Sequence, residues 1–324
     1  MNTNTSTLKY TKKKSLRKQF IKYRHIFWFI IPALAVTLFW GYTPMIGTLI
    51  AFRTKFDLTS FYTPLGSFFD PTANWTLMQF RAIFYDVDFI VALKNTLTIS
   101  FLKLFICFPL SIITAILLSE LNNQKLAKFI LIVICLPNFL SWPVVNGIWE
   151  NLLSIQGGLV NNFLVNNGFL DEPFWFYGSR EWFKPLAVFL SAWKGTGWGS
   201  IMFYASIMSV DKSYYEAASI EGASKVQKIR YLTLPAIMPM IALMLVMNIT
   251  YILDAGFEQI FTMMNPETRY SQQIIGTYLY DISIVNQSNI PFAVALGVFN
   301  GAIATTFMLS GNALCKKTLG KGLW

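Results

Sequence analysis

The chain alternates long apolar runs with shorter polar and charged stretches. A helix that crosses a bilayer needs about 20 mostly apolar residues, and six runs reach that length. We expect spans at residues 26–50, 93–118, 129–149, 185–210, 234–254 and 291–314. The pattern therefore predicts an all-α membrane protein with six transmembrane helices and no soluble domain.

The third run is not typical of a regular helix. It contains Pro137, Pro143 and Gly147 within the segment LPNFLSWPVVNG. Irregular backbone at membrane depth is tolerated only where it faces protein or a cavity, so we expect this span to do so. Pro32 and Pro44 can kink the first span, which neighbouring helices tolerate.

Polar and basic segments surround the six spans. Residues 1–11 are polar and are expected to be disordered, and residues 12–27 alternate basic and apolar positions as an interfacial amphipathic helix does. The expected domains are a basic tail with this interfacial helix, a six-span domain with a polar island at 211–233, and a short tail. Their bounds are residues 1–25, 26–314 and 315–324.

Composition and charge support this layout and orient it. The chain is 54% hydrophobic and 13% charged, with a net charge of +10 and a mean hydropathy of +0.48. Its Lys and Arg residues crowd the start, the end and two inter-span loops, as the positive-inside rule expects for cytoplasmic segments. Both termini, residues 119–128 and residues 211–233 are therefore expected inside. Because the basic residues flank spans, we do not expect nucleic acid as a partner.

Several kinds of chemistry lack the residues they need. The one histidine, His25, lies in the basic flank, so neither a His-based metal site nor a catalytic triad can be assembled. The three cysteines show no paired spacing and are expected to be packing residues. No G-x-x-x-x-G-K-[ST] loop is present, so the chain is not expected to hydrolyse ATP, and we predict no enzyme and no metal site.

The polar island at 211–233 has the signals of two short helices. Ser213 followed by Glu216 is a capping-box pattern, which predicts that a helix begins at Ser213. Gly222 can take a left-handed conformation and end that helix.

The same island predicts how the chain returns to the membrane. Ser224 with Gln227 repeats the capping pattern, so a second short helix should follow at an angle. Pro235 suits the first turn of the next helix. The result expected is a small helix–turn–helix that projects from the membrane face.

This island resembles the E-A-A loop of ABC importer permeases, written E-A-A-x3-G-x9-I-x-L-P. The positions on the pattern are Glu216, Ala217, Ala218, Gly222, Leu234 and Pro235. Leu232 stands where the family usually has Ile, a mild departure. The resemblance implies that the loop, with Ser213 at its start, docks into a groove on a separate ATPase. There Glu216 would meet a basic group; alternatively it only caps its own helix, and the two roles can coexist.

Polar groups inside the spans are costly and often mark a solute path. These groups are Lys103, Asn138, Asn146, Lys194, Asn248, Asp254 and Asn300. Aromatic residues accompany them, and aromatic faces beside amides and carboxylates suit a sugar. The simpler alternatives remain open: Trp149 and Trp198 can be interfacial anchors, and Lys194 can pair with a carboxylate or extend to the surface.

Further stretches resemble the permeases of complex-carbohydrate ABC importers, of the lipoprotein-associated B type. They are Pro44–Phe52, Leu136–Val145, Gly157–Asn161, Trp193–Ser200 and Asp254–Phe261. The resemblance implies a type I importer in a bacterial cytoplasmic membrane, with a second homologous permease, an ATPase dimer and an extracytoplasmic sugar-binding protein. ATP and magnesium would bind the partner ATPase, and no cofactor would bind this chain. Similarity to maltose-type permeases implies a sugar path through Trp142, Trp193, Lys194, Asn248, Tyr251, Asp254 and Glu258, with Trp193 stacking on the sugar.

Three alternatives stay open from the residues alone. An ABC permease for a peptide or phosphate would be favoured by a strongly charged cavity. An ion-coupled secondary transporter would need a network of acidic residues deep in the spans, and Asp254 alone does not make one. A membrane enzyme lacks catalytic groups.

Overall fold

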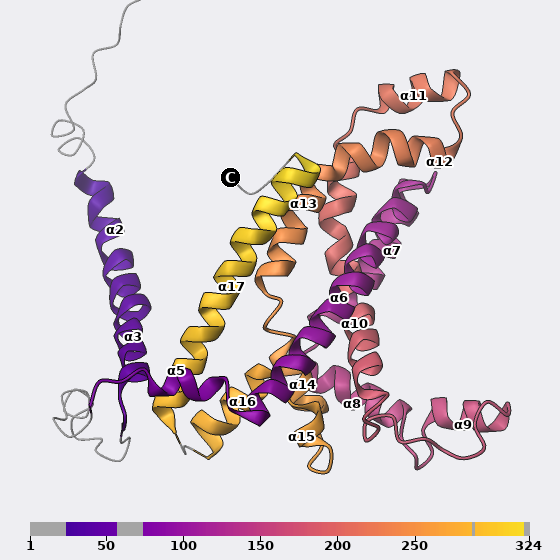
Figure 1. Cartoon of the computed structure of the whole chain (residues 1–324). Coiled ribbons are helices and arrows are strands. Elements are labelled where there is room, and N and C mark those ends of the chain that lie inside the picture. Colours follow the sequence, from indigo (N-terminus) through magenta and orange to yellow (C-terminus); the bar gives the residue numbers. More distant parts are fainter. Residues whose placement is uncertain (1–23, 57–73, 287–288, 321–324) are drawn as a thin grey trace, which may run out of the picture. The chain divides into compact units, whose positions relative to one another are not determined.

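A computed structural model describes residues 24–56, 74–286 and 289–320 of the chain. These residues form helices, turns and coil, with one antiparallel bridge between Arg53 and Trp75. The chain separates into two compact units, residues 1–50 and residues 51–324 (Figure 1). Each unit is described by itself.

The first unit is a run of helical turns. It contains α2 (Arg24–Val36), the π-helical turn η1 (Thr37–Tyr42) and α3 (Thr43–Ile46), and it leads into the 3₁₀ turn η2 (Gly47–Phe52). The widened turn η1 ends just before Pro44, which cannot donate a hydrogen bond to the preceding turn. The expected interfacial helix at 12–27 lies mostly outside the described residues.

The second unit holds the remaining helices. Before the polar island at 211–233 these are α5 (Met78–Ile83), α6 (Val87–Ser119), α7 (Gln124–Cys135), η3 (Leu136–Phe139), α8 (Trp142–Leu152), α9 (Leu159–Asn166) and α10 (Phe183–Met208). After it come α11 (Lys212–Ile220), α12 (Lys225–Lys228), η4 (Ile229–Thr233), α13 (Leu234–Thr250), α14 (Phe257–Met263), α15 (Arg269–Gln272), α16 (Ile275–Tyr280), η5 (Asp281–Val285) and α17 (Ile290–Leu319).

Four helices in the described part of the chain are long and apolar enough to cross a membrane. They are Trp28–Phe52, Val87–Ser119, Lys225–Thr250 and Ile290–Lys317. A bent pair, Gln124–Phe139 with Trp142–Leu152, is also long and apolar enough if it is counted as one broken span. The helix α10 has 26 residues but is not apolar enough, because its middle is rich in Gly, Ser, Thr and Lys. The protein is thus an all-helical, multi-pass membrane protein.

The third predicted span is broken rather than continuous. The helix that begins at Gln124 ends at Phe139, and α8 leaves it at an angle of 98°. Pro137 lies in the first turn of η3 and Pro143 in the first turn of α8, where a proline needs no backbone partner. The predicted irregularity is confirmed, since the segment 129–149 is divided between two helices rather than forming one straight helix.

The stretch 255–289, which lies between the fifth and sixth predicted spans, is a packed helical layer. It contains α14, α15, α16 and η5. Ile260 and Ile274 are fully buried in one apolar cluster with residues of α6 and α10. Two apolar segments of this stretch each bury one face. The free energy gained by burying these side chains exceeds the cost of ordering the polar turns between them.

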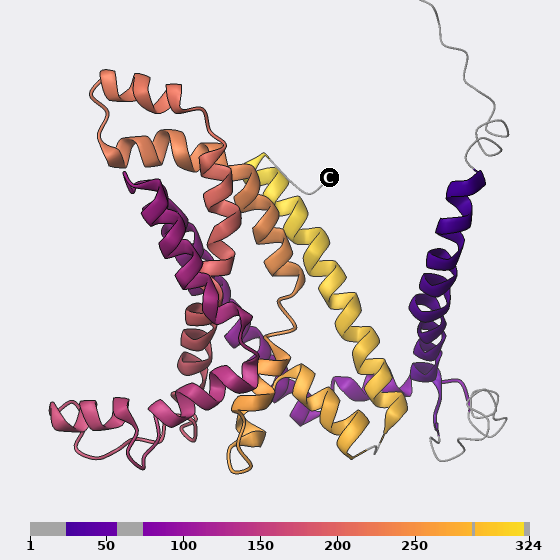
Figure 2. The same cartoon turned by 180° about the vertical axis from the view of Figure 1, so that it is seen from behind.

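The helix α10 is central to the second unit. It packs along α6 and also against α7 and α13 (Figures 1 and 2). Gly197 allows the closest approach, since a Cβ atom there would lie 2.1 Å from the carbonyl oxygen of Ile134 in α7. A Cβ atom added at Gly199 would likewise lie 2.7 Å from the hydroxyl oxygen of Ser111 in α6. The small residues that make α10 less apolar are thus the ones that let its neighbours approach.

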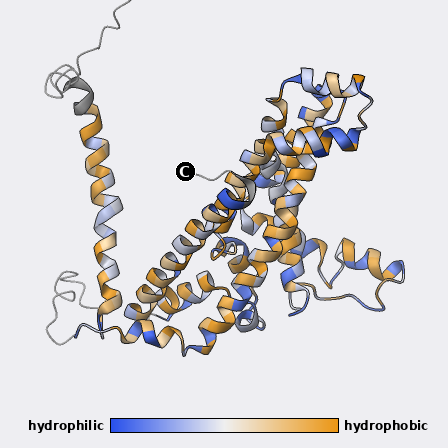
Figure 3. Ribbon diagram, turned by 45° about the horizontal axis from the view of Figure 1, so that its top comes forward, coloured by the Kyte–Doolittle hydropathy of each residue, from blue (hydrophilic) through white to orange (hydrophobic). Residues whose placement is uncertain are grey.

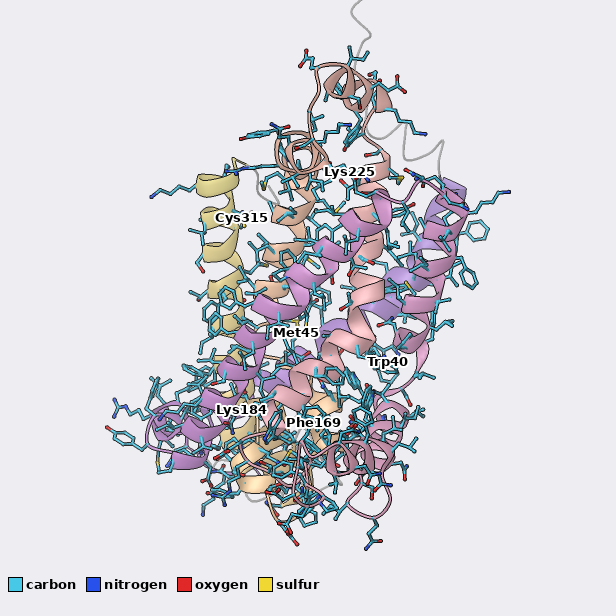
Figure 4. All side chains as sticks on the ribbon, turned by 90° about the vertical axis from the view of Figure 1, so that its right-hand side faces the viewer. Trp40, Met45, Phe169, Lys184, Lys225 and Cys315 are labelled. Carbon is cyan, nitrogen blue, oxygen red and sulfur yellow. The ribbon has the colours of Figure 1, made fainter. Side chains whose placement is uncertain are left out.

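The second unit has two distinct ends. Figure 4 shows Lys225 and Cys315 near one end, and Lys184 and Phe169 near the other. The first end carries α11 and α12, and the second carries α8, α9 and the helical layer from α14 to η5 (Figure 1). Orange apolar residues dominate the long helices between these ends (Figure 3).

Candidate functional site

The polar island 211–233 begins with a helix capped by Asp211. The Asp211 carboxylate accepts a hydrogen bond of 2.9 Å from the backbone N–H of Ser213, and α11 begins at Lys212. The prediction that Ser213 caps this helix is therefore wrong. Aspartate is a strong N-cap residue, and its position two residues earlier places its oxygen on the first free amides.

Removing this cap should loosen α11 without disturbing the spans. Hydrogen bonds from the backbone and side chain of Ser213 lower the pKa of the Asp211 carboxyl. The cap is therefore present above the unfolded value of about 3.9 and is lost as the pH falls through the lower folded value. We expect Asp211→Ala to speed amide exchange in α11 at pH 7. Asp211→Asn, which can still cap, should exchange as the wild type does; equal rates in all three proteins would contradict the assignment.

The end of α11 is confirmed as predicted. Gly222 has a φ of 80°, and its N–H donates to the Ser219 carbonyl at 3.1 Å. The N–H of Ala223 donates to the Ala218 carbonyl at 2.9 Å, which completes the Schellman pattern. Glycine is favoured at the left-handed position because it has no Cβ atom.

The second capping pattern is also confirmed. The N–H of Ser224 donates to Gln227 Oε1 at 2.7 Å, and the N–H of Gln227 donates to Ser224 Oγ at 3.3 Å. The helix that begins here does not stop, however, but passes through the π-helical turn η4 into α13, where Pro235 lies in the first turn.

The helix α11 projects with most of its surface free. None of its residues is buried, and the side chain of Ile220 is 89% exposed. Two contacts tie it to the next helix: Tyr215 and Thr233 share a hydrogen bond of 3.0 Å, and Lys228 Nζ donates to Ser219 Oγ at 2.6 Å. Glu216 lines a groove of about 600 Å³ beside α7 and α10. Because Asp211 caps the helix, Glu216 is not needed for that task.

A cavity of about 310 Å³ lies between α6, α10 and the end of α13. It contains three of the predicted path residues, Asn248, Tyr251 and Asp254. Lys103 and Cys107 line it from the middle of α6, and Ser191 lines it from α10. The wall thus combines the aromatic rings of Phe108, Phe203 and Tyr251 with amide, hydroxyl, carboxylate and ammonium groups.

The other four predicted path residues lie outside this lining. Lys194 is only 8% exposed; its Nζ donates to the Asn138 carbonyl at 2.8 Å and lies 5.3 Å from the ring centre of Trp142. It thereby holds a carbonyl at the end of η3, where the third span breaks.

Of the two remaining residues, Trp193 packs against another side chain and Glu258 is exposed. Trp193 packs edge-on against Trp149, with ring centres 5.6 Å apart. Glu258 is exposed in the first turn of α14.

The fifth predicted span ends earlier than expected. The helix α13 stops at Thr250, and Ala255 and Gly256 have φ values of 51° and 85°. Asp254 therefore belongs to a turn between α13 and α14 rather than to a helix. A left-handed alanine is uncommon and persists only when its surroundings hold it.

Two residues at this turn were missed as site residues. Lys103 was noted as a charge inside a span, and its Nζ donates to the Ala255 carbonyl and to Gln259 Oε1, both at 2.7 Å. Gln259 is fully buried, whereas its charged neighbour Glu258 is exposed. Gln259 rather than Glu258 faces the protein interior, and the helical register after Gly256 cannot be read from the sequence.

Known proteins match nearly the whole chain. A family model described as "Binding-protein-dependent transport system inner membrane component" matches residues 108–317. The polygalacturonan/rhamnogalacturonan transport system permease protein YteP of Bacillus subtilis is 33% identical over 314 residues, covering 97% of this chain and 94% of that protein. Protein LplB of the same organism is 33% identical over 296 residues, covering 91% of this chain and 89% of its own length.

A solved structure agrees with these relatives. It is titled as a bacterial alginate ABC transporter in complex with a periplasmic protein that holds an alginate pentasaccharide. One of its chains superposes with a TM-score of 0.83 and 31% identity, covering 96% of this chain and 100% of that one.

Proposed function

The chain belongs to the family of binding-protein-dependent transport system inner membrane components, and on that premise we propose that it is the permease subunit of an ATP-driven importer of oligosaccharides. The observation that carries the proposal is the likeness, over 96% of the chain, to one chain of a bacterial alginate ABC transporter. The name of YteP, which includes polygalacturonan and rhamnogalacturonan, supports the same class of solute.

The cavity between α6, α10 and α13 supports a sugar as the solute. Its volume of about 310 Å³ lies at the lower end of the range for small-ligand sites. Tyr251 offers a ring face for the C–H side of a pyranose, and Asn248, Asp254 and Ser191 offer groups for its hydroxyls. A mixed lining of this kind favours a sugar over phosphate or a peptide.

The proposed topology has six spans with both termini in the cytoplasm. They are the first unit, α6, the broken helix from α7 to α8, α10, α13 and α17. This topology places α11 and α12 on the cytoplasmic side as the coupling segment. The domain bounds of 1–25, 26–314 and 315–324 belong to the same proposal.

The partners proposed follow from the family. A second homologous permease would complete the path, and an ATPase dimer, holding ATP and magnesium, would receive α11. An extracytoplasmic binding protein would deliver the sugar. In this assembly the chain itself has no catalytic role. The coupling set is Ser213, Glu216, Ala217, Ala218, Gly222, Leu234 and Pro235.

Purification of the tagged chain from its native membrane tests this assembly. We expect a second permease, an ATPase and a binding protein to co-purify. Proteoliposomes of the complex should then take up at least one member of a panel of trigalacturonate, an alginate trisaccharide, arabinotriose and maltotriose. Uptake of phosphate or a tripeptide instead would change the solute class. Transport by this chain alone would overturn the proposal and favour an ion-coupled carrier.

Cys107 provides a natural probe of the cavity. It lines the cavity from α6, whereas Cys135 and Cys315 are buried elsewhere. In a Cys135→Ala, Cys315→Ala complex, we expect the transported sugar and its binding protein to slow alkylation of Cys107 by about tenfold at saturating occupancy. The control is a sugar that the complex does not transport. Equal alkylation rates with both sugars would place the solute path elsewhere.

A further inference from the structure

The turn between α13 and α14 supplies part of the cavity wall. Tyr251 and Asp254 lie in it and line the cavity, and Ala255 and Gly256 follow with positive φ values. A turn with a left-handed alanine does not hold its shape by itself, because the strained backbone must be balanced by surrounding contacts.

Lys103 supplies one of these contacts from α6. Its Nζ donates to the Ala255 carbonyl at 2.7 Å, and a Cβ atom added at Gly256 would lie 2.9 Å from the same nitrogen. The ammonium thus lies directly against the left-handed pair. Ionisable groups inside spans are costly, and they persist where they satisfy backbone carbonyls or serve transport.

Gln259 anchors Lys103 and joins two further helices, α10 and α8. Its Oε1 accepts from Lys103 Nζ and from Ser191 Oγ, both at 2.7 Å. Its Nε2 donates to the Ala187 carbonyl in α10 at 2.7 Å, and its own carbonyl accepts from Asn146 in α8 at 3.2 Å. The side chain is fully buried and, unlike that of Lys103, is absent from the cavity lining. All its side-chain hydrogen-bonding groups are therefore used inside the protein.

We propose that Lys103 and Gln259 are positioning residues of the solute path, which hold the turn at 251–256 so that Tyr251 and Asp254 face the cavity. The proposal rests on the proposed function and deepens it. Two of the three protons of the Lys103 ammonium are committed to protein acceptors, so its main task is to hold the turn. Gln259 acts only through other residues, because the solute does not reach it.

Isosteric variants of Gln259 separate positioning from direct contact. Gln259→Met keeps the size but removes every side-chain hydrogen bond, whereas Gln259→Glu keeps the acceptor for Lys103 and Ser191 and loses only the donor to the Ala187 carbonyl. Thr98→Ala, at an exposed position of α6, is the control. Uptake of the best-transported sugar of the panel is measured with the full complex in proteoliposomes. We expect Gln259→Met to raise KM about tenfold with kcat little changed, and Gln259→Glu to stay within about threefold of wild type.

Amide exchange at residues 251–256 gives a second readout that needs no solute. We expect faster exchange in Gln259→Met and in Lys103→Met than in the wild type and Thr98→Ala. Lys103→Met also tests the proposal if Gln259→Met does not assemble, and it should raise KM in the same way.

Three results would overturn the proposal. They are an unchanged exchange rate at 251–256 in both methionine variants, an unchanged KM in an assembled methionine variant, and a KM in Gln259→Glu as high as in Gln259→Met. If the wild-type complex takes up no sugar of the panel, the proposed function fails instead, and the exchange rates decide by themselves whether this pair holds the turn.

Discussion

Replacing Gly197 with alanine is expected to prevent the normal packing of α10 on α7 and to abolish recovery of the assembled transporter. The added Cβ atom would lie 2.1 Å from the carbonyl oxygen and 2.4 Å from the carbonyl carbon of Ile134. Both atoms belong to backbone, so no side-chain rotation relieves the overlap. The helices must separate, at a cost of at least about 3 kcal/mol, the upper end of ordinary overpacking.

A loss of that size is a large part of a typical stability of about 5–15 kcal/mol. The measurement is the yield of monodisperse complex after purification in detergent, together with its melting temperature. Gly301→Ala is the matched control, because Gly301 is also in a long helix but has no neighbouring atom within 4 Å of the added Cβ position. A wild-type yield and melting temperature for Gly197→Ala would show that the two helices do not pack as described.

Reversing the charge of Glu216 is expected to uncouple ATP hydrolysis from sugar uptake while leaving the permease folded. Glu216 is exposed, and the helix that carries it is capped by Asp211. If Glu216 meets a basic group on the ATPase, lysine replaces an attraction with a repulsion. Loss of a desolvated charge pair costs about 2–5 kcal/mol, which predicts a fall in uptake of at least about tenfold.

The control for Glu216→Lys lies at the end of the same helix. Glu221 is also exposed but stands outside the E-A-A pattern, so Glu221→Lys makes the same charge change away from the expected contact. Uptake and ATP hydrolysis are measured on reconstituted complexes with equal subunit content. Glu216→Lys with wild-type uptake, or a Glu221→Lys variant impaired to the same degree, would remove Glu216 from the coupling contact.

The helices of the polar island 211–233 were largely predictable because their signals are local. The left-handed Gly222 and the capping box of Ser224 depend on residues three or four positions apart, and both were confirmed. The cap at Ser213 was misplaced, because Asp211 and Ser213 are both good caps and their competition is decided by backbone geometry.

The cavity was predictable only in part. Asn248, Tyr251 and Asp254 were found because polar and aromatic residues stand out near the end of an apolar run. Lys194 stands out equally but is turned toward a backbone carbonyl at the break of the third span. Whether Lys103 or Lys194 lines the cavity depends on how α6 and α10 are rotated about their axes. The hydrophobic pattern of these two helices does not predict that rotation.

The sequence by itself determined the helical membrane class, the resemblance to the family and the two short helices of the polar island 211–233, because hydrophobic run length and short-range capping are properties of consecutive residues. Only the tertiary structure decided where the spans break and which residues the breaks bring together. The 98° turn after Phe139 and the left-handed pair at Ala255 and Gly256 exist because distant side chains satisfy the backbone there. Lys103 and Gln259 are separated by 156 positions, and their contact depends on the packing of whole helices.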